Sequence, residues 1–207
     1  MKIIAALSFA LLLLLPGQSG AAEQPAETKA NFSIDIPKGW IHYGTQAPKY
    51  MPDYVKKAFD AVDIAQPELY LVGWKEDRGR FVAAFAVTYI PEGMATFTDK
   101  VLQGAPSERE VTGMAFSNLE AKKIRKGYTA RGQKVLESSV DFLQAEKMLV
   151  ALSDAMVDAG GVKRLRAATY YFRGDAMVGV ITLRNADAPE DVVADLDALP
   201  TSVDWNN

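Results

Sequence analysis

The segment from Arg80 to Ile90 constrains the fold more than any other part of the sequence, because both of its alternating faces are mainly apolar. Its residues are RFVAAFAVTYI, so neither the odd-numbered nor the even-numbered set looks suited to solvent. A strand of this kind is buried on both sides and needs structure packed against each side. The sequence offers too few strands for a second large sheet, so we expect helices to provide the cover.

Other strands are expected around this one. Residues 68–77 pair with 80–93 in a hairpin whose short turn surrounds Gly79. Residues 162–173 and 176–184 form a second hairpin through the Gly174-Asp175 pair. Strands are also expected over 134–143 and, from the period-two alternation of FSIDIP, over 32–36. Residues 146–157 fit a helix face slightly better than a strand by periodicity alone, and both remain open at this point.

Helices are indicated in three places. Apolar residues recur at helical spacing after Pro52, and again after Pro189, where Glu190 and Asp191 suit the first turn of a helix. Residues 94–126 look helical in two pieces. The second piece opens with the capping box formed by Ser107 and Glu110, and we expect it to end before Gly127.

The first 22 residues have the layout of a secretory signal peptide. A positive charge at Lys2 precedes an apolar run from Ile3 to Leu15, and Pro16 ends that run. The run is shorter than the roughly 20 residues that span a bilayer. We therefore expect cleavage after Ala21 or Ala22, a tether over residues 23–30, one globular domain over 31–207, and no transmembrane segment in the mature chain.

Composition excludes several classes of protein. The chain has no cysteine, so disulfides, thiolate metal sites and cysteine nucleophiles are absent. Removing Lys2 from the 23 basic residues leaves 22 against 26 acidic ones, a net charge of −4, which gives no field for nucleic acid. We expect no bound cofactor and no metal.

The order of these elements, together with FSIDIPKGW near the start of the mature chain, resembles the PsbP-like α/β/α sandwich superfamily. The matching motif consists of Phe32, Ile36, Pro37, Gly39 and Trp40. The resemblance implies an α+β fold, a single α/β/α sandwich with a central, largely antiparallel sheet of about six or seven strands and helices on both faces. It makes residues 146–157 a strand and Trp40 a structural residue packed on the sheet. It also implies binding to partners rather than catalysis.

His42 is the only histidine, so sites built on two histidines are impossible. With its neighbours Trp40 and Tyr43 it could line the rim of a cleft, although a partly exposed loop histidine is the more common situation. No catalytic residue is assigned. Whether any catalysis occurs stays uncertain, and a small hydrolase or transferase using carboxylates around His42 is the alternative function.

The most concentrated charge in the sequence is a run of basic residues with no acid between positions 122 and 134. It could meet anionic lipid, lipopolysaccharide or an acidic protein, or it could only close a helix C-terminus. The sequence therefore predicts a non-catalytic binding or assembly module of the bacterial cell envelope, periplasmic or secreted, whose partner is an unknown envelope protein or an anionic surface. The candidate binding residues are Trp40, His42, Tyr43, Lys122, Lys123, Arg125, Lys126, Arg131 and Lys134.

Overall fold

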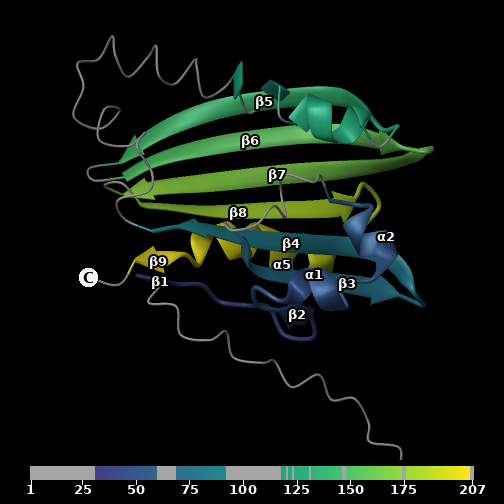
Figure 1. The fold of residues 1–207 in the computed structure, drawn as a ribbon, viewed down its shortest axis with the longest axis horizontal. Helices are drawn as coiled ribbons and strands as arrows, with labels where there is room; N and C mark the ends of the chain where they lie inside the picture. The colour runs from purple at the N-terminus through teal and green to yellow at the C-terminus, as the bar shows by residue number, and fades with distance from the viewer. Residues whose placement is uncertain are drawn as a thin grey trace, which may run out of the picture.

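The main element of the fold is a seven-stranded antiparallel sheet (Figure 1). The computed structural model describes residues 31–59, 69–91, 118–119, 121–122, 124–130, 132–145, 148–173 and 176–205. The strands follow the spatial order β2-β3-β4-β8-β7-β6-β5, and every neighbouring pair is antiparallel. Their bounds are β2 Ile41–Tyr43, β3 Leu69–Asp77, β4 Arg80–Ile90, β5 Lys134–Ala145, β6 Met148–Ala159, β7 Val162–Arg173 and β8 Ala176–Asn185.

Tight turns set the register of the hairpins. The β3–β4 turn places Arg78 at φ 50° and Gly79 at φ 74°, and the β6–β7 turn places Gly160 at φ 67° and Gly161 at φ 88°. Two successive residues with positive φ match the twist of the flanking strands, which is why such turns favour glycine. The strand assignment for residues 146–157 is confirmed by β6 from Met148 onward, and residues 146–147 lie outside the described ranges. Both predicted hairpins are present.

The two-sided burial predicted for β4 is confirmed. Ala84 and Ala86 lie in one apolar cluster, whereas Ala83, Phe85 and Val87 lie in another. β4 pairs with β8 over its last eight residues, and this pairing joins the β2–β4 meander to the β5–β8 meander. β4 and β8 therefore lie in the middle of the sheet, with buried apolar residues on both of its sides.

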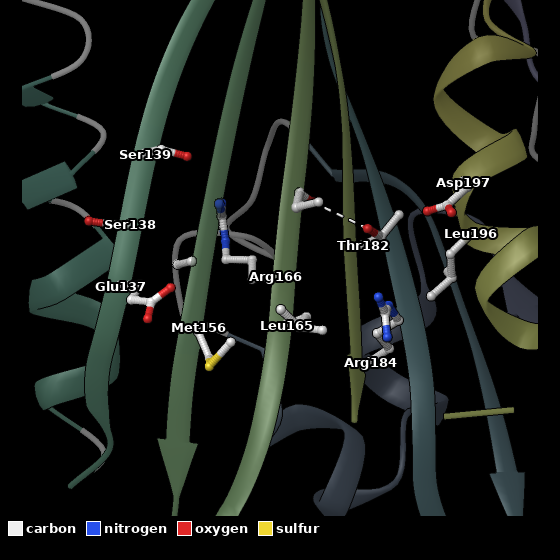
Figure 2. Close-up of a pocket in the computed structure, with 12 residues that line it drawn as sticks. Glu137, Ser138, Ser139, Met156, Leu165, Arg166, Thr182, Arg184, Leu196 and Asp197 are labelled. Atoms are coloured by element: carbon white, nitrogen blue, oxygen red, sulfur yellow. Dashed lines mark hydrogen bonds between the residues drawn. The ribbon is translucent and has the colours of Figure 1, made fainter. Parts of the chain in front are cut away.

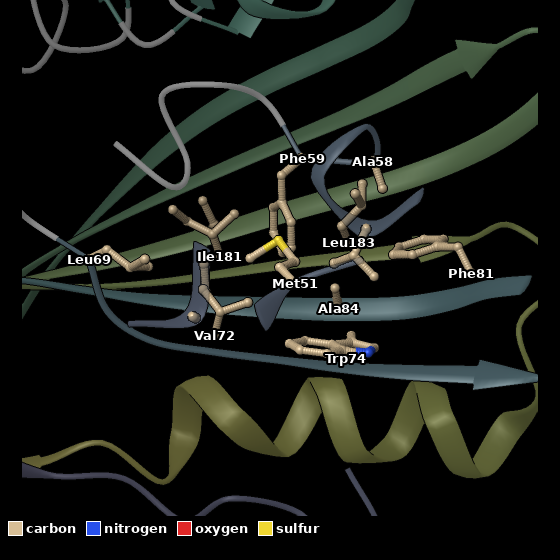
Figure 3. Packing of buried hydrophobic residues seen from close by; sticks show 14 of the residues in the cluster. Met51, Ala58, Phe59, Leu69, Val72, Trp74, Phe81, Ala84, Ile181 and Leu183 are labelled. Atoms are coloured by element: carbon tan, nitrogen blue, oxygen red, sulfur yellow. The ribbon is translucent and has the colours of Figure 1, made fainter. Parts of the chain in front are cut away.

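Two short helices, α1 Ala47–Tyr50 and α2 Asp53–Lys56, pack in the first of these clusters. Met51, which follows α1, and Phe59, which follows α2, lie over Val72, Ile181 and Leu183 of the sheet (Figure 3). Pro52 precedes α2 in an extended conformation, so its missing N–H costs the helix nothing.

The C-terminal helix α5, Glu190–Thr201, packs in the second cluster through Val192, Leu196 and Leu199, which are all buried. It runs along the sheet near β3 and β4 (Figure 1). The helix and these three inward residues agree with the sequence prediction. The fold is therefore α+β and consists of an antiparallel sheet with helices packed on it.

The N-terminal strand expected over residues 32–36 is shorter than predicted and lies outside the main sheet. Only Phe32–Ser33 form β1, and they pair with β9, Asp204–Trp205. Ile34 and Ile36 still pack in the cluster beneath α5. The alternation of apolar and polar residues here therefore reflects which side chains are buried, and not a longer paired strand. Pro37, which has no N–H to donate, follows directly.

Helical residues are described at 118–119, 121–122 and 124–129, and we call this segment the basic helix. The expectation that it ends before Gly127 is wrong, since helical residues continue to Thr129. The end is set by Gly132, at φ 70°, whose N–H donates to the Thr129 carbonyl at 3.0 Å. The Gln133 N–H donates to the Tyr128 carbonyl at 3.0 Å, which completes a Schellman motif.

Several sequence predictions concern residues outside the described ranges: the signal peptide over 1–22, the tether over 23–30, and the capping box of Ser107 and Glu110. Among the helices that the structure does describe, none combines the length and the apolar character needed to cross a membrane.

Candidate functional site

Trp40 is a structural residue, as the sequence predicted. Gly39, at φ 79°, turns the chain so that the indole lies 6% exposed beneath α5. Its ring centroid is 5.4 Å from that of Phe85, and its Nε1 donates to the Asp195 carboxylate at 2.8 Å. The Lys75 ammonium lies 5.9 Å from the centre of the ring. Little of the indole surface is therefore accessible to a ligand.

Tyr43 packs among residues of the other cluster. Its ring stacks on Trp74 at 5.6 Å and on Tyr50 at 5.1 Å between centroids, whereas Trp40 packs beneath α5. Trp40 and Tyr43 thus belong to different cores, and they do not line one cleft.

His42 lies between them on the edge strand β2, opposite Gly73. Within the described residues, no hydrogen bond or ion pair joins it to a carboxylate, and no group of three histidine, aspartate or glutamate side chains is placed to hold a metal ion. The acid–base arrangement that would favour an enzyme is therefore not seen around His42 in this part of the chain.

The basic helix has one apolar and one basic face. Ile124 and Tyr128 are buried against Ala155 and Val157 of β6. On the outward face, the exposed residues include Leu119, Lys122, Arg125, Lys126 and Thr129. Leu119 is unusual for an outward position because it is 64% exposed.

The outward face of the basic helix also borders a hollow of about 720 Å³, whose described lining includes Lys122, Arg125 and Lys126. Lys123 and Arg131 lie outside the described residues. Lys134 is exposed at the start of β5, where it faces Asp158 across the ladder. The structure therefore brings three of the six predicted bases together on one surface.

The positive charge of this surface is not neutralised by described neighbours. Ion pairs in the described residues include those of Lys75 with Asp191, at 3.4 Å, and Asp195, at 3.8 Å, both on α5. Within the same residues, none is seen for Lys122, Arg125 or Lys126. A cation with no nearby acid attracts anions at the range allowed by salt screening, about 8 Å under physiological conditions.

A partly buried arginine lies close to the inner side of the basic helix. The Arg164 guanidinium lies 5.0 Å from the centre of the Phe81 ring, and its Nε donates to the Asn185 amide oxygen at 3.4 Å. Burial lowers the pKa of Arg164, and the nearby Tyr128 opposes that shift. Because arginine keeps its charge in proteins, this side chain adds to the positive potential beneath the basic helix.

A second hollow, which the sequence analysis did not find, lies beside α5. Its volume is about 410 Å³, and its lining includes Glu137, Met156, Leu165, Arg184 and Asp197. Figure 2 shows Arg184 between Glu137 on β5 and Asp197 on α5. These residues come from separate strands and a helix far apart in the chain, so no local motif could have revealed them. The lining has charges of both signs and indicates no particular ligand.

Comparison with known proteins gives a likeness in fold. No family model matches the sequence, and no curated protein matches it. Among solved structures, the chain is similar to "Solution Structure of Cyanobacterial PsbP (CyanoP) from Synechocystis sp. PCC 6803", with 13% identity and a TM-score of 0.49 over 87% of this chain and 89% of that one. At this identity the likeness concerns the fold alone.

Proposed function

We propose that this protein is an exported, non-catalytic binding module of the bacterial cell envelope that attaches to anionic membrane surfaces through its basic helix. The observation that carries the proposal is the outward face of that helix. Lys122, Arg125 and Lys126 are exposed there, and no described acid pairs with any of them.

The exposed Leu119 favours a lipid surface over an acidic protein as the partner. On a helix, Leu119 lies one turn from Lys122 and two turns from Lys126, so the three side chains lie on one side. An apolar side chain flanked by lysines suits the boundary between headgroups and acyl chains, where the ammonium groups meet lipid phosphates. Each basic residue near an anionic membrane contributes about 1 kcal/mol.

Export, cleavage and the single domain over residues 31–207 belong to the same proposal, and so does the complete α/β/α sandwich. α5 packs in one apolar cluster, and α1 and α2 pack in the other, which supports a helical layer on each face of the sheet. The signal-like sequence of residues 1–22 supports export. No observation in the described residues favours the His42 enzyme, so it is not proposed.

Co-sedimentation with vesicles tests the proposal. Wild type and a variant carrying Lys122→Gln, Arg125→Gln and Lys126→Gln are mixed with phosphatidylglycerol-containing vesicles at low and at moderate salt. We expect retention of the wild type that weakens with salt, and little retention of the variant. Exposed charges contribute little to stability, so both proteins should unfold at the same temperature. Equal retention of both proteins would overturn the lipid contact and leave an acidic protein partner as the candidate.

A further inference from the structure

We infer that α2 forms a second part of the membrane-binding surface, so that the protein attaches in one defined orientation, with the face carrying α2 and the basic helix toward the lipid. This inference rests on the proposed function. It adds Lys56 and Lys57, which the sequence analysis did not select, and a headgroup site between the two helices.

The end of the basic helix is tied to α2. Gln133, which completes the Schellman motif, donates from its side-chain Nε2 to the Lys57 carbonyl at 3.3 Å. A hollow of about 400 Å³ lies at this junction, lined by Asp53, Lys56, Lys57 and Gln133. Lys57 is exposed and Lys56 is half-buried. Among its described lining residues, two lysines outweigh one aspartate, so this part of the lining is positively charged.

Gln133, which lines this hollow, also carries a hydrogen-bond acceptor that has no described partner. The side-chain Oε1 of Gln133 is buried and has no hydrogen-bond partner within the described residues. A buried acceptor without a partner costs free energy that a ligand hydroxyl would recover. Two ammonium groups beside an acceptor suit a phosphodiester that carries a hydroxyl group nearby, as in the headgroup of phosphatidylglycerol.

The register of the sheet shows that α2 and the basic helix lie on the same side. The basic helix packs on Ala155 and Val157 of β6, which pair with Arg166 and Arg164 of β7. Paired residues point to the same side of a sheet, and so do alternate residues along a strand. Ala168 therefore shares this side, and it packs in the cluster that contains the residues of α2.

The surface of α5 lies on the opposite side of the sheet. Val178 and Val180 of β8 pack with α5, whereas Ile181 and Leu183 pack with the residues of α2. The alternation along β8 assigns the two helices to opposite sides. A protein attached through α2 and the basic helix would hold the α5 hollow away from the membrane.

Site-specific labelling tests the orientation of the bound protein. The chain has no cysteine, so each variant with one introduced cysteine is labelled at that position only. An environment-sensitive fluorophore is attached to full-length mature protein carrying Leu119→Cys, Asp53→Cys or Asp197→Cys. Asp53 lines the hollow at α2, and Asp197 is the matched control, an exposed aspartate on α5. With phosphatidylglycerol vesicles, we expect a blue shift at positions 119 and 53 and no shift at 197.

The other outcomes are distinct. A shift at position 119 alone would overturn the role of α2 while leaving the proposed function intact. A shift at none of the three positions would overturn both. Equal shifts at all three would show adsorption without orientation, which would also overturn the inference.

Charge removal gives an independent measurement. Lys56→Gln with Lys57→Gln should weaken binding to the same vesicles about 30-fold, the equivalent of ~1 kcal/mol for each basic residue. The matched control, Lys38→Gln with Lys163→Gln, removes two other exposed lysines and should change binding by less than about threefold. Equal effects of the two pairs would show that only net charge matters, and the inference would fail.

Discussion

Replacement of Trp40 tests whether the turn after Pro37 holds α5 on the sheet. The indole is 6% exposed, packs on Phe85, and donates a 2.8 Å hydrogen bond to Asp195. Trp40→Ala removes the ring and leaves a cavity, which should cost about 3–5 kcal/mol. For a domain of this size, each kcal/mol lowers the melting temperature by about 2–4 °C, so we expect a fall of roughly 10 °C.

Trp40→Phe separates the packing contribution from the hydrogen bond. Phenylalanine keeps an aromatic ring on Phe85 but has no donor for the Asp195 carboxylate, a loss of about 1–2 kcal/mol. Asp195 keeps its ion pair with Lys75 at 3.8 Å and is 32% exposed, so its carboxylate is not left buried without a partner. Urea unfolding followed by far-UV circular dichroism gives both values. If Trp40→Phe cost as much as Trp40→Ala, the packing argument would be refuted.

Three further predictions concern other parts of the chain. Gly73→Ala should cost about 1–3 kcal/mol in urea unfolding, because the new Cβ would lie 2.2 Å from the Phe85 ring in the core; an unchanged midpoint would contradict this packing. Tyr171 donates to the Pro200 carbonyl at 2.6 Å, so Tyr171→Phe should cost about 1 kcal/mol at neutral pH. Burial raises the pKa of Tyr171 in the folded state, so the stability that its hydroxyl contributes is complete below pH ~10 and declines above that pH. The difference in unfolding free energy between wild type and Tyr171→Phe should therefore narrow above pH ~10. A constant difference up to pH ~11 would count against this prediction. Intact-mass measurement of protein from its native envelope should show a chain without the first 21 or 22 residues, and a species retaining Met1 would disprove cleavage.

The sequence predicted those elements whose residues are buried on a regular pattern. β4 could be assigned because both of its alternating sets are apolar, and α5 because Val192, Leu196 and Leu199 follow helical spacing. β6 needed the family resemblance, since its apolar residues fit both periods. Its strand state is set by pairing with β5 and β7, which is a long-range effect.

The errors have physical causes as well. Ile34 and Ile36 alternate like strand residues but pack on the α5 cluster without a ladder. Gly127 resembles a helix terminator, yet Gly132 has the positive φ that ends the helix. Of the candidate site, the basic helix could be found from its charges, whereas the tie between Gln133 and Lys57 joins residues 76 positions apart and leaves no local signal.

The most direct test of the central claim is an equilibrium titration of wild type and the Lys122→Gln, Arg125→Gln, Lys126→Gln variant against two kinds of vesicle. Losing three basic residues at ~1 kcal/mol each should weaken partitioning onto phosphatidylglycerol-containing vesicles about 150-fold. On neutral phosphatidylcholine vesicles, the two proteins should bind weakly and alike. A difference of less than about threefold on the anionic vesicles would contradict the claim that the basic helix attaches this protein to membranes.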